Sequence, residues 1–96
     1  MFIVMNRITV AEGRETDFEK TFTERDRAVD LMPGFVDMQV LRPTEGSAYV
    51  VLTRWKSRED FENWTRSEAF IAAHRKQLPG LAETRPVLEM YEVFTQ

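Results

Sequence analysis

The chain has 96 residues, of which thirteen are Lys or Arg and sixteen are Asp or Glu, so its formal net charge is −3. This length is typical of one domain, and we expect residues 1–96 to form a single one, with 43% hydrophobic residues to fill its core. Cysteine is absent, which excludes disulfide scaffolds, zinc fingers, thiolate catalysis and iron–sulfur clusters. The acidic balance argues against a nucleic-acid partner.

No apolar run in the chain approaches the ~20 residues that a membrane-spanning helix needs. One of the longest, at residues 49–52, is far shorter. Residues 1–7 have no basic region ahead of their apolar side chains, and therefore do not resemble a signal peptide. We expect a soluble cytoplasmic protein without a membrane partner.

The first half of the chain predicts a strand, a helix and a hairpin. Residues 2–10 are rich in β-branched and apolar types, which predicts a strand, and Gly13 marks the following turn. From Arg14 the pattern becomes helical, and we expect this amphipathic helix to end before Pro33. Its stripe consists of Phe18, Phe22, Arg25 and Val29. The predicted hairpin strands are residues 35–41 and 48–55.

The second half predicts another helical region and a last strand. Ser57 and Asp60 have the spacing of a capping box. The helix has a break near residues 65–67, resumes through Phe70 to Lys76, and ends at Leu78-Pro79-Gly80. A polar, mobile loop then leads to Pro86, and residues 87–94 form a strand. The order βαββαβ predicts an α+β fold, a ferredoxin-like sandwich with helices on one face of an antiparallel sheet.

Both faces of this sheet carry apolar side chains. In the first strand Phe2 and Val4 share one face, and Ile3 and Met5 share the other. A monomer of this size has no element left to cover the second face. We therefore predict a homodimer that pairs through its sheet faces.

Three side chains stand out as candidates for a site, although each also has an ordinary structural explanation. Asn6 lies in register with buried hydrophobic positions of the first strand, where a backbone group could satisfy it or it could donate to a ligand in a cavity. His74, the one histidine in the chain, flanks the apolar stripe of its helix, where it could be packed, exposed or an iron ligand. Trp64 could simply be a core aromatic.

Other types of catalytic site have little support. The carboxylates fall on charged helix faces, and the chain has no nucleophile-elbow, P-loop or dinucleotide-binding motif. These patterns argue against hydrolysis and nucleotide chemistry. They leave an apolar pocket with an amide, an imidazole and an indole.

In this order and context, Asn6, Trp64 and His74 resemble the IsdG-type haem-degrading monooxygenases, a branch of the antibiotic biosynthesis monooxygenase superfamily. The resemblance spans nearly the whole chain. Its motifs are Asn6-Arg7, Phe22-x-x-Arg25, Pro33-Gly34-Phe35 and the stretch from Trp55-Lys56-Ser57 through Phe61, Trp64, Ser67 and Phe70 to Ala72-Ala73-His74. The fold that it implies is a dimeric α+β barrel.

The resemblance also implies a role for each site residue. His74 would be the axial ligand of the haem iron, Asn6 would lie on the distal side, and Trp64 would press the macrocycle out of plane. Phe22 and Arg25 would be pocket residues of the first helix, with Arg25 near a propionate.

Haem would be both cofactor and substrate of a reaction that opens the porphyrin ring with O2 and releases iron. Because no flavin or nicotinamide motif is present, electrons would come from a separate reductase or a small reductant. Two other functions fit the same residues. One is a cofactor-independent, quinone-forming monooxygenase, and the other is a dimer that binds haem without degrading it.

Overall fold

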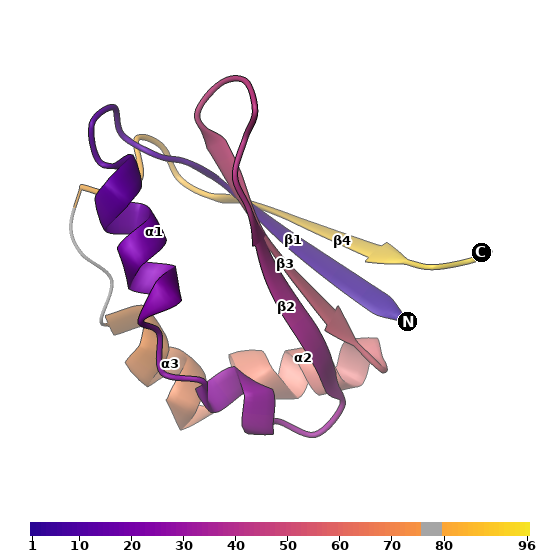
Figure 1. Cartoon of the computed structure of the whole chain (residues 1–96). Coiled ribbons are helices and arrows are strands. Elements are labelled where there is room, and N and C mark those ends of the chain that lie inside the picture. Colours follow the sequence, from indigo (N-terminus) through magenta and orange to yellow (C-terminus); the bar gives the residue numbers. More distant parts are fainter. Residues whose placement is uncertain (76–79) are drawn as a thin grey trace.

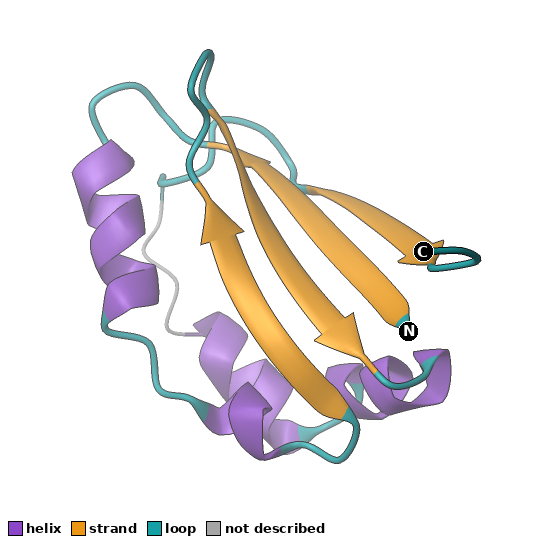
Figure 2. Ribbon diagram, turned by 45° about the vertical axis from the view of Figure 1, so that its right-hand side comes forward, coloured by secondary structure: helices purple, strands orange, loops and turns teal. Residues whose placement is uncertain are grey.

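The structure is a computed structural model, and it describes residues 1–75 and 80–96. Four strands form one antiparallel sheet in the order β2-β3-β1-β4 (Figure 2). The central strands are β1 (Phe2–Thr9) and β3 (Ala48–Trp55), and the edge strands are β2 (Phe35–Leu41) and β4 (Val87–Glu92). The predicted ferredoxin-like α+β fold is confirmed, and the hairpin strands match their predicted bounds.

The helices of the described residues lie on one side of the sheet (Figure 1). They are α1 (Glu15–Thr23), the 3-10 helix η1 (Ala28–Leu31), α2 (Arg58–Thr65) and α3 (Glu68–Arg75). None of them has the length and apolar character needed to cross a bilayer.

The prediction of one continuous helix from Arg14 to Pro33 is wrong, because α1 ends at Thr23 and only the short η1 follows. Polar side chains stabilise the break. The Asp26 carboxylate accepts a hydrogen bond from the backbone N–H of Ala28 at 3.2 Å, as a short acidic side chain does in a turn. Asp30 in η1 pairs with arginines on its N-terminal side.

The predicted break in the second helical region is confirmed. The Ser57 hydroxyl accepts a hydrogen bond from the backbone N–H of Asp60 at 3.2 Å and begins α2. Ser67 then separates α2 from α3 and caps α3, since its Oγ accepts from the N–H of Phe70 at 3.1 Å. The predicted helix end at Lys76 and Leu78-Pro79 lies outside the described residues.

The predicted mobile loop, which follows Leu78-Pro79-Gly80 and leads to Pro86, lies within the described residues. In it, Leu81 is buried and Ala82 forms an isolated β-bridge with Val10. The Leu81 carbonyl accepts from Ala11 at 2.8 Å, and the Glu83 N–H donates to Thr9 at 2.7 Å. The loop is therefore anchored to the end of β1 along residues 81–83.

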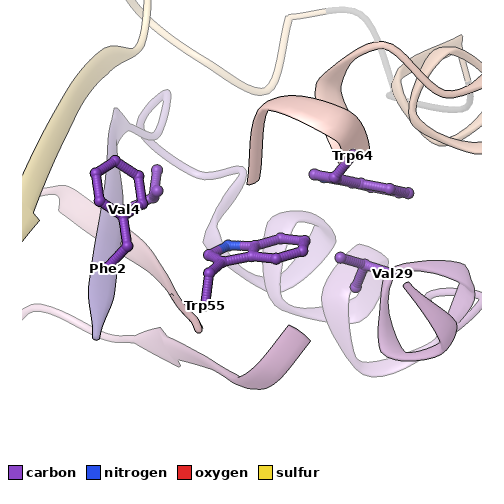
Figure 3. Packing of buried hydrophobic residues seen from close by; sticks show 5 residues of the cluster. All are labelled: Phe2, Val4, Val29, Trp55 and Trp64. Atoms are coloured by element: carbon purple, nitrogen blue, oxygen red, sulfur yellow. The ribbon is translucent and has the colours of Figure 1, made fainter. Parts of the chain in front are cut away.

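Two separate hydrophobic clusters lie between the sheet and the helices. One contains Phe2, Val4, Val29, Trp55 and Trp64, and in Figure 3 the two indole rings and Val29 converge between the strand and helix layers. The other contains Ile8, Val10, Phe18, Tyr49 and Leu81. Asn6 lies on β1 between the two clusters, so the core is interrupted where that residue faces the helices.

The outer face of the sheet has no helix over it among the described residues (Figure 1). Its side chains include Ile3, Met5, Val50, Leu52 and Tyr91, as the strand register shows. Two ion pairs also lie there, Arg7 with Glu89 at 2.9 Å and Arg54 with Asp37 at 2.9 Å. The face is thus mostly apolar and crossed by a few charges.

Candidate functional site

A cavity of about 590 Å³ opens between the sheet and the helices. Small-molecule sites typically measure ~300–1,000 Å³ and have mainly apolar walls. Asn6, Phe22, Arg25, Trp64 and His74, the residues predicted for the site, all line it. The cavity therefore brings together residues from β1, α1, α2 and α3 and from the segment after α1.

Asn6 places a side-chain amide on the sheet wall of the cavity. Its cross-strand neighbours Val51 and Leu88 line the same cavity, so the amide is on the helix side of the sheet. No hydrogen bond joins this amide to any other residue that the structure describes, and the residue is half-buried. Among the described residues, therefore, no backbone group hydrogen-bonds the Asn6 amide, and this amide is available to a ligand.

His74 presents an imidazole from the last turn of α3. Its Nδ1 lies 2.8 Å from the carbonyl oxygen of Phe70. A carbonyl only accepts, so Nδ1 must carry the proton and donate it. In the neutral ring, Nε2 then holds a free lone pair, which is the form that binds a metal ion. His74 was expected to be packed, exposed or an iron ligand. In the structure its ring is exposed, lies partly against the Phe70 ring and can act as a ligand.

Trp64 belongs both to the core and to the cavity wall. Only 9% of the residue is exposed, and it packs in the cluster with Trp55 and Val29. Its ring also meets Phe70 edge-on, with centroids 5.5 Å apart. Trp64 is thus both a core aromatic and a residue of the cavity wall.

The Arg25 guanidinium is held at the cavity by Asp30. Two of its nitrogens donate to the same carboxylate oxygen at 3.3 Å, near the long end for such bonds. Arg27 donates to the other oxygen of Asp30 at 2.8 Å. A guanidinium has five N–H donors, so Arg25 can still bind a carboxylate of a ligand. Phe22 packs against Phe18, with ring centroids 5.0 Å apart.

Several polar residues of the cavity were missed from sequence: Thr21, Asp26, Thr53 and Thr65. Thr21 and Thr65 donate their hydroxyl protons to helix carbonyls, which leaves only acceptor lone pairs. The Thr53 hydroxyl instead accepts from the Trp55 indole at 3.0 Å and keeps its own proton for a ligand. Threonine is ordinary in strands, so only its register opposite Val4, on the same sheet face as Asn6, could have singled out Thr53.

A charged cluster outside the cavity ties α1 to the hairpin. Arg42 and Tyr49 both hydrogen-bond the Glu19 carboxylate. The bonds from Arg42 and then Tyr49 lower the pKa of Glu19 to about 2, and the bond to Glu19 and burial raise the pKa of Tyr49. This cluster fixes the helix that carries Phe22.

Comparisons with known proteins agree on one family. The family model described as antibiotic biosynthesis monooxygenase matches residues 1–76. A heme oxygenase (mycobilin-producing) of Mycobacterium tuberculosis is 38% identical over 92 residues, which cover 95% of this chain and 87% of that protein. A heme oxygenase (staphylobilin-producing) of Staphylococcus haemolyticus is 35% identical over 91 residues, covering 92% and 86%.

A solved structure extends the likeness to three dimensions. The heme-degrader MhuD of Mycobacterium tuberculosis, with two hemes bound in its active site, superimposes with a TM-score of 0.86 at 34% identity. The superposition covers 100% of this chain and 98% of that chain.

Proposed function

This chain belongs to the antibiotic biosynthesis monooxygenase family, and we propose that it is a haem-degrading monooxygenase. Haem binds in the cavity between the sheet and the helices as the substrate, and its ring is opened oxidatively. The observation that carries this proposal is the free Nε2 of His74, fixed by the hydrogen bond from Nδ1 to Phe70, at the wall of an apolar cavity. The relatives named above, with their printed activities, support it.

The cavity residues fit the three parts of haem. An aromatic and aliphatic wall suits the flat apolar macrocycle. The neutral imidazole of His74 suits the iron, and we assign it as the axial ligand. Arg25 suits a propionate, because a guanidinium pairs with carboxylates in a fork geometry.

Asn6 and Trp64 then act on the bound substrate from different walls. Asn6 lies on the sheet wall and His74 on the helix wall, and we assign to the amide the distal role, in which it would donate a hydrogen bond to what binds at the iron. Trp64 is braced by the core behind it and presses against the macrocycle. Catalysis by this chain is therefore mainly positioning and distortion of the substrate.

Oxidative ring opening also consumes O2 and electrons, with iron and an opened tetrapyrrole as products. We assign the electrons to a separate reductase or a small reductant, because the sequence has no dinucleotide-binding motif. The absence of cysteine suits a reducing cytoplasm, which we propose as the location.

We also propose that two copies pair through their outer sheet faces into a dimeric α+β barrel. Supporting this, Val87 and Tyr91 of β4 are 55% and 49% exposed there, beside Ile3, Met5 and Val50. An exposed, mostly apolar surface of this kind is typical of an interface.

The test is a titration of the purified protein with hemin, followed by ascorbate in air with catalase present. We expect a saturable Soret shift, then its loss with formation of a product whose mass shows an opened ring. His74→Ala should lose most of the binding, whereas Ile71→Ala, on the same helix but outside the cavity lining, should keep it.

The other outcomes separate the alternatives. No Soret shift contradicts the proposal, and oxidation of a quinol without hemin would then indicate a cofactor-independent enzyme. A complex that persists under ascorbate and air would indicate a haem-binding protein without activity.

A further inference from the structure

The junction of α2 and α3 connects Trp64 to His74 through two intervening residues, Ser67 and Phe70. The Ser67 hydroxyl donates to the carbonyl of Trp64 at 2.7 Å and accepts from the N–H of Phe70 at 3.1 Å. The same hydroxyl therefore closes the last turn of α2 and caps α3. This fixes the angle at which α3 leaves α2.

Phe70 contacts both functional side chains. Its ring lies against the His74 imidazole, with centroids 3.9 Å apart and planes 35° from parallel. It also meets the Trp64 ring edge-on at 5.5 Å and 88°. Its carbonyl accepts the Nδ1–H of His74 at 2.8 Å. One residue thus restrains the imidazole by its ring and by its backbone.

These contacts limit both side-chain torsions of His74. The hydrogen bond directs Nδ1 to the helix backbone and leaves Nε2 on the other edge of the ring. The Phe70 ring restricts rotation of the imidazole plane, which an exposed histidine would otherwise have. A change in the position of Phe70 would also alter its contact with the Trp64 ring.

We propose that Phe70 is a positioning residue, which sets the plane and tautomer of the His74 imidazole and couples it to Trp64, with Ser67 holding the junction. The consequence for haem rests on the proposed function above. The orientation itself is a property of the free protein and is tested there.

The first experiment uses NMR of the free protein and Phe70→Leu, which keeps apolar volume and removes the flat ring. With one histidine and two tryptophans in the chain, their signals are readily assigned. In long-range ¹H–¹⁵N spectra at alkaline pH, wild type should show the Nδ1–H tautomer, with imidazole protons shifted by the adjacent ring. Phe70→Leu keeps the backbone carbonyl that accepts from Nδ1 and removes only the ring contacts. If the ring is what holds the imidazole plane in line with that carbonyl, the imidazole should rotate away part of the time, so that the variant shows mixed tautomers, loses that shift and moves the Trp64 indole signal.

Two variants serve as controls. Phe70→Tyr retains the ring and should retain the wild-type signals. Ile71→Ala shortens an exposed neighbour on the same helix and should leave them unchanged. If Phe70→Leu does not fold, as judged by circular dichroism, Ser67→Ala should loosen the junction and shift the His74 and Trp64 signals together, whereas Ser67→Thr should keep them.

The second experiment is hemin binding. Phe70→Leu loses the aromatic contact with His74, and the free energy of such a contact corresponds to hemin binding about two- to tenfold weaker than in wild type. Phe70→Tyr should bind hemin nearly as well as wild type. Wild-type imidazole signals in folded Phe70→Leu, or in Ser67→Ala where Phe70→Leu does not fold, would overturn the inference. Failure of wild type to bind hemin would overturn the proposed function instead, and the NMR result would still decide the role of Phe70.

Discussion

The Tyr49 hydroxyl on β3 donates a hydrogen bond to the carboxylate of Glu19 on α1, and this bond joins the wall of the cavity to the middle of the sheet. Phe18 lies over the same tyrosine, with ring centroids 4.7 Å apart. The position of α1 therefore depends on a polar contact and an aromatic contact side by side.

Protonation of Glu19 should weaken this attachment. Its pKa is lowered from 4.5 to about 2 in the folded protein, so its contribution to stability is present above pH 4.5 and is lost as the pH falls toward 2. Glu19→Gln should be less stable than wild type to urea at pH 7, and the difference should shrink between pH 4.5 and 2. An equal difference at pH 7 and pH 2.5 would contradict this assignment.

Removing the Asn6 amide should separate binding from turnover. Asn6→Ala leaves His74 and the aromatic wall in place, so hemin affinity should stay within about threefold of wild type, well under the tenfold that corresponds to 1.4 kcal/mol. Turnover under ascorbate should fall by at least tenfold, because a positioned hydrogen bond in a site is commonly worth more than that. Asn63→Ala, an exposed position on α2, is the matched control. Equal turnover by Asn6→Ala and wild type would refute the distal role.

Trp64 should affect stability and product separately. Trp64→Ala should cost about 3–5 kcal/mol of unfolding free energy, as for other buried aromatics. Trp64→Phe should cost less and should change the distribution of ring-opened products, measured by mass spectrometry and chromatography. Trp55→Phe is the control, since Trp55 is fully buried but does not line the cavity. It should lower stability and leave the products unchanged.

A new charge on the outer sheet face should disrupt the proposed dimer. Val50 lies on β3 beside Arg7 and Leu41, and Val50→Lys would repeat a positive charge across a two-fold axis. Analytical ultracentrifugation should show a shift from dimer to monomer. Leu31→Lys replaces a side chain that is 87% exposed on η1 and should remain dimeric. A monomeric wild type would refute the pairing.

Gly34 should be far less replaceable than Gly46, although their φ angles, +80° and +82°, are nearly the same. Alanine at this φ costs roughly 1–2 kcal/mol by itself. A Cβ at Gly34 would also overlap the Asp60 side chain, while one at Gly46 meets open space. Gly34→Ala should therefore lose clearly more stability in urea unfolding than Gly46→Ala. Similar losses would show that Asp60 moves aside without cost.

The strands were predictable because their signals are local. β2 and β3 have apolar alternation bounded by Pro33-Gly34 and by a loop with Gly46. The gap between α1 and η1 was not, because Phe22, Arg25 and Val29 continue the helical spacing and no Gly or Pro interrupts it. There the backbone follows the hydrogen bond that the Ala28 N–H donates to the Asp26 carboxylate and the ion pairs of Asp30, which periodicity does not report.

The site residues, too, were predictable from sequence only in part. Register alone placed Asn6 among hydrophobic neighbours, but that it lines the same cavity as His74 depends on where the tertiary fold places α3 relative to the sheet. Family resemblance supplied that pairing. Thr53 had no such signal, because its distinction lies in accepting the Trp55 indole N–H, a side-chain contact along β3 that alternation of residue types does not report.

The helices around the cavity are short, with nine residues in α1 and eight each in α2 and α3. Isolated helices shorter than about 12–15 residues are marginal in water, so this layer is stable only while it is docked on the sheet. Local openings of the layer should therefore cost less free energy than opening β1 and β3. A molecule that fills the cavity contacts these helices and the sheet together, and it would slow amide hydrogen exchange chiefly in the helices.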